Sequence, residues 1–210
     1  ALGKLYLAGD AALPRDPEAA LKWLTYAAEL GNQFAQYRLG KLLLKGDDGI
    51  PKDVITAIRW LTAAAKQENG YAEYALALVY LTGEDAPKDS VKALSLLKRS
   101  AGRGNQFAQY RLGKLLLQGE DAPKDVKAAI RWLTAAAEQG NQYAQYALGK
   151  LYLLGKEVPK DRSSAIKWFQ LAADQGNEYA QYFLKHMDDR LGQPPVAAVI
   201  SLFHHLANIF

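Results

Sequence analysis

The chain has 210 residues, of which half are hydrophobic, and a net charge of +4. This composition excludes an intrinsically disordered chain, supplies enough apolar surface for a continuous core, and carries too mild a charge to require an anionic partner. The absence of cysteine excludes disulfides and thiolate zinc sites. It does not fix the cellular compartment, although we favour the cytoplasm. The apolar stretches are too short to span a membrane.

The chain opens with a pattern that returns inside a later predicted helix. Residues 1–7 (ALGKLYL) are identical to residues 147–153. We therefore expect the chain to begin within a helix and without its native N-terminus, as an excised fragment does. Asp16 and Pro17 then predict the start of a second helix, because aspartate caps helix N-termini and proline fits the first helical position.

From here on, the sequence repeats with a period of 36 or 37 residues. A proline followed by Lys or Arg and then Asp recurs at Pro14, Pro51, Pro87, Pro123 and Pro159. An alanine recurs with the same period, at Ala35, Ala72, Ala108, Ala144 and Ala180. A fixed period of this length indicates a stack of small helical units, none of which can bury both of its faces alone.

Each period is predicted to form two helices, as residues 141–176 illustrate. Asn141 is expected to cap the first helix and Gly155 to end it in the left-handed conformation. Asp161 follows the turn and caps the second helix, which ends at Gly176. We predict helix pairs at 33–45 with 53–67, 70–82 with 89–102, 106–118 with 125–139, and 142–154 with 161–175.

The whole chain, 1–210, is predicted to be a single repeat domain. A truncated unit, 1–31, comes first, and a degenerate terminal unit with capping helices, 177–210, comes last. The complete units between them are 32–68, 69–104, 105–140 and 141–176. In the terminal unit Pro195 keeps the register, whereas His204 stands in the column that carries tryptophan in most other units.

A combined pattern runs through these units: Ala-x-x-x-Leu-Gly-x-x-Tyr, then Gly, Pro-Lys-Asp, Ala-x-x-Trp, Ala-Ala and Gly-Asn. It resembles the Sel-one-like repeat, a relative of the tetratricopeptide repeat, over nearly the whole chain. The resemblance implies an all-α fold, a right-handed α–α superhelix (solenoid) of antiparallel helix pairs whose first helices line a concave groove. It also implies a scaffold or adaptor role in protein complexes, most often in bacteria.

Unit 69–104 departs from this pattern. Leu96 replaces the tryptophan, Ala77 replaces a glycine, and Glu68 stands where a boundary glycine is expected. In the regular units, small residues such as Gly40 are expected to let two helices approach closely, while the tryptophan fills the space between neighbouring units. We therefore expect unit 69–104 to be the least stable internal element.

Residues that carry chemistry are scarce. The sequence has no Gly-rich phosphate loop, nucleophile elbow or metalloprotease helix, so we expect no enzyme, no catalytic residue and no cofactor. The histidines are His186, His204 and His205. Adjacent His204 and His205 point about 100° apart on a helix, which does not suit one metal ion, so no metal site is expected.

The candidate partner-binding surface lies on the first helices of the units. Tyrosine recurs at Tyr37, Tyr74, Tyr110, Tyr146 and Tyr182, and an aromatic residue three positions earlier at Phe34, Tyr71, Phe107, Tyr143 and Tyr179. Cations on the same face are Arg38, Lys41, Arg111, Lys114 and Lys150. Two interpretations stay open: the columns pack between units, or they recognise a partner. The predicted partner-binding residues are Tyr37, Arg38, Lys41, Tyr74, Tyr110, Arg111, Lys114, Tyr146 and Lys150.

A block of two units is copied within the chain. Residues 31–46 match residues 104–119 at 15 of 16 positions, and residues 57–65 are identical to 129–137. Such copying lengthens a surface without creating a catalytic centre. We therefore predict a non-catalytic scaffold or adaptor that binds a peptide or protein segment on the concave face. Nucleic acid is the less favoured partner, through the same lysines.

An alternative function comes from the tail. Residues 200–210 (ISLFHHLANIF) resemble a segment that follows such repeats in some mobilisation relaxases of bacterial conjugative elements. This resemblance implies an accessory C-terminal region of a DNA-processing protein. The catalytic tyrosine motif and the metal-binding histidine cluster of a relaxase are not visible in the sequence, so this piece is not expected to be the nuclease.

Overall fold

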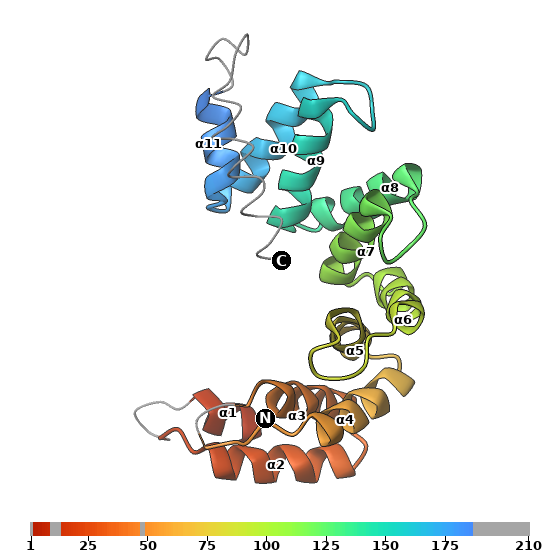
Figure 1. Cartoon of the computed structure of the whole chain (residues 1–210). Helices are drawn as coiled ribbons and strands as arrows, with labels where there is room; N and C mark the ends of the chain where they lie inside the picture. The colour runs from red at the N-terminus through yellow and green to blue at the C-terminus, as the bar shows by residue number, and fades with distance from the viewer. Residues whose placement is uncertain (1, 9–13, 47–48, 187–210) are drawn as a thin grey trace. The chain divides into compact units, whose positions relative to one another are not determined.

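The computed structural model describes residues 2–8, 14–46 and 49–186, in which the regular elements are helices (Figure 1). They are α1 (Leu2–Ala8), α2 (Pro17–Glu29), α3 (Gln33–Lys45), α4 (Val54–Lys66), α5 (Gly70–Thr82), α6 (Ser90–Gly102), α7 (Gln106–Gln118), α8 (Val126–Glu138), α9 (Gln142–Leu154), α10 (Arg162–Asp174) and α11 (Glu178–His186). Consecutive helices pack as pairs, α3 with α4, α5 with α6, α7 with α8 and α9 with α10. The all-α repeat fold is confirmed, and each predicted pair agrees with the observed one to within one residue at every end.

The chain divides into two compact bodies, Ala1–Asn141 and Gln142–Phe210. The first contains α1 to α8, and the described part of the second contains α9 to α11. Each body has its own core: fully buried leucines such as Leu61, Leu97 and Leu112 in the first, and Phe169 in the second. The predicted terminal unit is described only as far as His186, so Pro195, His204 and His205 lie outside the described residues.

The Pro-Lys-Asp triplets form turns and caps, as the sequence predicts. The side chains of Asp53, Asp89 and Asp125 each accept a hydrogen bond from the backbone N–H three residues later, at 2.9–3.0 Å. The backbone N–H of the same aspartates donates to a carbonyl of the preceding helix, as Asp53 does to Leu43 at 2.9 Å. One residue therefore begins the second helix and joins it to the first.

The lysine of a triplet reaches the next unit. Lys88 forms an ion pair with Asp121, at 2.8 Å, and Lys52 forms one with Asp85. In both cases the acidic residue lies in the corresponding turn one unit further along the chain. Because these lysines are half-exposed, each pair is worth little in stability by itself. Their regular recurrence shows that the turns of neighbouring units lie side by side within the first body.

The tightest contact within a pair joins a glycine to the residue that follows the tryptophan. A Cβ added to Gly40 would lie 2.6 Å from Cγ of Leu61, and one added to Gly113 would lie 2.7 Å from Cγ of Leu133. Both leucines are fully buried. The small residues do allow close approach, and within each pair the leucine that follows the tryptophan fills the space beside the glycine.

The tryptophans lie further out than the sequence suggests. Trp60 and Trp132 are only partly buried, and each packs at the edge of a core cluster. The guanidinium of the preceding arginine lies over each ring, 5.2 Å from the Trp60 ring for Arg59 and 5.7 Å from the Trp132 ring for Arg131. Consecutive residues on a helix point about 100° apart, so the tryptophan lies at the edge of the core while the leucine that follows it is buried.

Replacing Gly113 with Ala tests this close approach. The new methyl group has to displace Leu133 or the helix backbone, so we expect Gly113→Ala to lower the free energy of unfolding by about 1–3 kcal/mol despite the better helix propensity of alanine. Gly102→Ala is the matched control, because nothing lies within 4 Å of the added Cβ. That variant should be neutral or slightly more stable in urea unfolding. Equal effects of Gly113→Ala and Gly102→Ala on stability would show that the close approach at Gly113 does not require glycine.

Pairs of glutamines, one buried and one exposed, join the helices at the opposite end from the turns. Gln36 donates to the carbonyl of Ala28 in the preceding unit, at 3.0 Å, and accepts a hydrogen bond from Gln67, at 2.8 Å. Gln109 and Gln139 repeat this arrangement, also at 2.8 Å. The side chain of the first glutamine in each pair is buried. The exposed amide thereby satisfies the buried side-chain oxygen of its partner.

Unit 69–104 replaces the neutral pair by charged residues. Glu73 stands in the first glutamine position and is fully buried, and Arg103 stands in the second. The carboxylate of Glu73 lies 2.6 Å from Nη2 of Arg99 and 3.3 Å from Nε of Arg103. Arg99 also donates to the carbonyl of Ala65, at 3.3 Å, which replaces the bond that a glutamine amide makes in the neighbouring units.

The boundary of this unit is strained at the position where the regular units have glycine. Glu68 adopts φ +65°, where Gly31 and Gly104 adopt φ +84° and +87°. A side chain in this left-handed region meets the backbone, which glycine avoids. The side chain of Glu68 accepts a hydrogen bond from Arg103 at 2.9 Å, so the residue that strains the boundary also joins the charged group. The lower stability of this unit stays a prediction.

The charged pair should behave as one element in a double-mutant cycle. We expect Arg103→Gln to lower the urea midpoint, because the fully buried Glu73 then keeps only one guanidinium partner. The variant Glu73→Gln/Arg103→Gln recreates the pair of the neighbouring units and should recover much of that loss. Midpoints from circular dichroism supply the measurement. Strictly additive losses would show that the two side chains act independently.

Candidate functional site

The tyrosine column packs between neighbouring first helices. In the first body, the ring of Tyr37 on α3 lies 5.9 Å from that of Tyr71 on α5, and the ring of Tyr74 on α5 lies 6.2 Å from that of Phe107 on α7. Burial raises the pKa values of Tyr37 and Tyr74. Tyr110 is likewise partly buried. These rings hold α3, α5 and α7 side by side, which agrees with the packing interpretation of the tyrosines.

Tyr146 and Lys150 belong to the second body. The Tyr146 ring lies 5.8 Å from the ring of Phe169, 6.0 Å from that of Tyr179 and 6.2 Å from that of Phe183. It is therefore part of an aromatic cluster around the core of that body. Lys150 is partly buried on α9, one helical turn after Tyr146. The other seven predicted site residues lie in the first body.

Identical sequences on α3 and α7 give different environments. Arg38 and Lys41 on α3 are exposed, whereas Arg111 and Lys114 on α7 are partly buried. Burial, and secondarily the charge of Arg111, lowers the pKa of Lys114. The two copies share twelve consecutive residues from the first helical position onward, so the difference comes from the neighbouring elements and not from local sequence.

The cations on α7 form no direct ion pair with an acidic side chain in the part of the chain that the structure describes. Nε of Arg111 is buried and has no hydrogen-bond partner there, and no ion pair includes Arg111 or Lys114. Asp121 is close enough to interact electrostatically with Arg111, but its carboxylate is engaged by Lys88 at 2.8 Å and by Ser90 at 2.7 Å. Two partly desolvated cations that form no direct ion pair favour the binding of an anion.

Helix α5, which lies between α3 and α7, carries apolar residues at the positions of these cations. Ala75 and Leu78 on α5 stand where α3 and α7 carry arginine and lysine, and both are partly buried. The surface therefore alternates across three adjacent helices. We call it the cation–apolar–cation face, and its members are Arg38, Lys41, Ala75, Leu78, Arg111 and Lys114.

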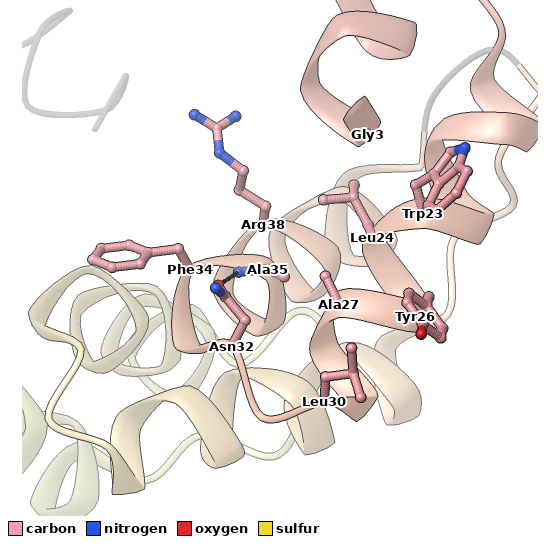
Figure 2. Close-up of a pocket in the computed structure, with 10 residues that line it drawn as sticks. All are labelled: Gly3, Trp23, Leu24, Tyr26, Ala27, Leu30, Asn32, Phe34, Ala35 and Arg38. Carbon is pink, nitrogen blue, oxygen red and sulfur yellow. Dashed lines mark hydrogen bonds between the residues drawn. The ribbon is translucent and has the colours of Figure 1, made fainter. Parts of the chain in front are cut away.

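A second candidate surface was not predicted from the sequence. An apolar depression between α2 and α3 exposes the large side chains of Trp23, Tyr26, Leu30 and Phe34 (Figure 2). Its other lining residues are Gly3, Leu24, Ala27, Asn32, Ala35 and Arg38. One feature of the sequence could have indicated this surface: Tyr26 and Leu30 stand where the next unit carries alanine and glutamine. Among the described residues, no ring packs on Phe34 as Tyr37 packs on Tyr71.

The described ranges, residues 2–8, 14–46 and 49–186, offer no grouping suited to a metal ion. They contain no group of three or more histidine, cysteine, aspartate or glutamate side chains placed to hold a metal ion. His186 lies against the ring of Tyr182, at 4.4 Å between ring centroids. Nor do residues 2–8, 14–46 and 49–186 include a helix with the length and apolarity needed to cross a membrane.

Comparison with known proteins identifies the repeat. The sequence model of the Sel1 repeat matches five times, at residues 1–32, 33–69, 70–105, 106–141 and 142–177. The chain belongs to the Sel1 repeat family. This membership confirms the resemblance drawn from the sequence pattern, and the Sel1 repeats account for the antiparallel pairs of both bodies.

Solved structures of other Sel1 repeat proteins are similar to this chain. A Sel1 repeat protein from Oxalobacter formigenes is 35% identical, with a TM-score of 0.78 over 88% of this chain and 53% of its own. The protein c5321, a protective antigen of uropathogenic Escherichia coli, is 35% identical, with a TM-score of 0.79 over 91% of this chain and 41% of its own. The chain thus spans about half the length of these two relatives or less. No curated protein sequence matches significantly.

Removing the charge of Arg111 should change the titration of Lys114. Because Arg111 helps to lower the pKa of Lys114, we expect Arg111→Gln to raise it. The measurement is a pH titration of the lysine Cε resonances by NMR. Arg38→Gln is the matched control, since it makes the same change on the exposed copy and should leave Lys114 unaffected. An unchanged pKa in Arg111→Gln would show that the two cations do not interact.

Proposed function

We propose that the chain is a non-catalytic interaction scaffold that binds an extended peptide or protein segment on the cation–apolar–cation face. Membership of the Sel1 repeat family supports a protein-binding role, because stacked helical repeats commonly act as interaction scaffolds. The observation that carries the proposal is the pair of partly buried cations on α7, Arg111 and Lys114, which form no ion pair with an acidic side chain among the described residues. A bound anionic group supplies the partner of such an ion pair.

Aromatic side chains beside the cations favour a protein ligand. The ring of Tyr74 on α5 stacks on that of Phe107 on α7, the helix that also carries Arg111 and Lys114. Exposed aromatic edges together with arginine are typical of the anchoring positions in protein interfaces. Phe107 keeps a large exposed surface despite its contact with Tyr74, so a partner side chain can pack on it.

Nucleic acid is a weaker match to this surface. A nucleic-acid backbone presents closely and evenly spaced phosphates and needs a continuous track of cations. Ala75 and Leu78 interrupt that track on α5. The relaxase alternative rests on residues 200–210, which lie outside the described residues, and none of the comparisons supports it.

A displayed library of random twelve-residue peptides tests the proposal. We expect the purified chain to enrich a set of peptides, and the variant Lys41→Glu/Lys114→Glu to lose their binding by about tenfold or more, since reversed charges repel an acidic ligand. Lys66→Glu/Lys98→Glu is the matched control, because it reverses two exposed lysines on second helices. That control should keep its binding.

Two further variants separate this face from other surfaces. Tyr26→Ser/Leu30→Gln makes the apolar depression of Figure 2 polar and should leave the enriched peptides bound. Lys150→Glu tests whether the second body contributes. If folded Lys41→Glu/Lys114→Glu keeps the same peptides as the parent, the proposed function on this face is wrong. Loss of binding in the depression variant alone would move the site to α2 and α3.

A further inference from the structure

We propose that the cation–apolar–cation face selects an extended peptide segment that carries two acidic side chains about five or six residues apart with an apolar side chain midway between them. This inference rests on the proposed function and specifies its ligand. It follows from the alternation of Arg38 and Lys41, then Ala75 and Leu78, then Arg111 and Lys114 across three adjacent helices of the first body.

The spacing follows from helix geometry. The first helices meet through aromatic rings and not through close backbone contact, so their axes lie at the upper end of the usual range for neighbouring helices, about 10 Å apart. With α5 between them, α3 and α7 are therefore separated by roughly 20 Å. An extended peptide advances about 3.3–3.6 Å per residue. A chain that crosses the three helices therefore places residues about five or six positions apart over α3 and α7. The residue halfway between them lies over Ala75 and Leu78.

The nature of each position follows from what it meets. A carboxylate over α7 neutralises two cations that are already partly removed from water, which is where a charge-assisted hydrogen bond is strongest. An apolar residue over α5 covers Ala75 and Leu78 without desolvating a polar group. A charged group at that midway position would lose hydration against apolar side chains, so an evenly charged polyanion is disfavoured.

The two acidic positions should differ in importance. Arg38 and Lys41 are exposed, and exposed ion pairs contribute little because water and salt screen them. Arg111 and Lys114 carry the same side chains in a partly buried setting. The two copies therefore form a strong and a weak subsite from one sequence, and the acid over α7 is the anchor.

Synthetic peptides test the motif directly. The probe is a fluorescein-labelled SESSLSSES peptide, in which two glutamates are six residues apart and a leucine lies midway, measured by fluorescence anisotropy with the full chain. We expect it to bind about tenfold more tightly than three controls: both glutamates replaced by glutamine, leucine replaced by serine, and the glutamates brought three residues apart. Equal binding of the six-residue and three-residue spacings would overturn the motif.

Variants of the protein complete the test. Arg111→Gln/Lys114→Gln should lower the affinity for the SESSLSSES peptide by about tenfold. Arg38→Gln/Lys41→Gln makes the same substitutions on α3 and should lower that affinity by clearly less. Equal losses would overturn the assignment of α7 as the anchor. Circular dichroism checks that each variant folds.

Replacing the two apolar residues on α5 with cations should change which ligands the face prefers. Ala75→Arg/Leu78→Lys gives α5 the same side chains as α3 and α7. That variant should gain affinity for polyglutamate and for a single-stranded oligonucleotide and lose its preference for the midway leucine. If the library peptides bind this face but SESSLSSES binds no better than its controls, the motif fails while the proposed function stands. If the library yields no peptide dependent on Lys41 and Lys114, the proposed function itself fails.

Discussion

In the pairs that carry the glycine of the repeat pattern, its close approach to a large side chain on the following helix determines the geometry of the pair. The contact at Gly40 and Leu61 leaves no room for a methyl group, and the same holds at Gly113 and Leu133. This fixes how near the two helices lie and therefore where the next first helix can pack. The tyrosine contacts between α3, α5 and α7, and the surface that those helices share, depend on that distance.

The elements of this fold were predictable because each is determined by residues near it in sequence. A capping aspartate such as Asp53, a helix-ending glycine and a 36- or 37-residue period define the helices to within one residue at each end. The position of the tryptophan was less predictable. Pattern alone could not distinguish the edge residue Trp60 from its buried neighbour Leu61, because both are large and apolar.

The properties of the candidate site depend on distant neighbours and so escaped the sequence. No local pattern distinguishes Lys41 from Lys114, since the helices that carry them have the same sequence up to the last residue. Their burial differs because different elements surround α3 and α7. The charged group around Glu73 was missed for a related reason, because Arg99 and Arg103 approach it only when α5 and α6 are folded together.

The buried charge of unit 69–104 constrains how the gene of this protein can be rearranged. Glu73 and Arg103 both lie within one period, as do Gln36 and Gln67. Duplication or deletion of whole periods therefore carries both members of each pair together. An unequal crossover between the codons of residues 73 and 103 would instead join a buried carboxylate to a glutamine, and the recombinant would be poorly stable. Period boundaries are thus the safe breakpoints, consistent with the internally copied block.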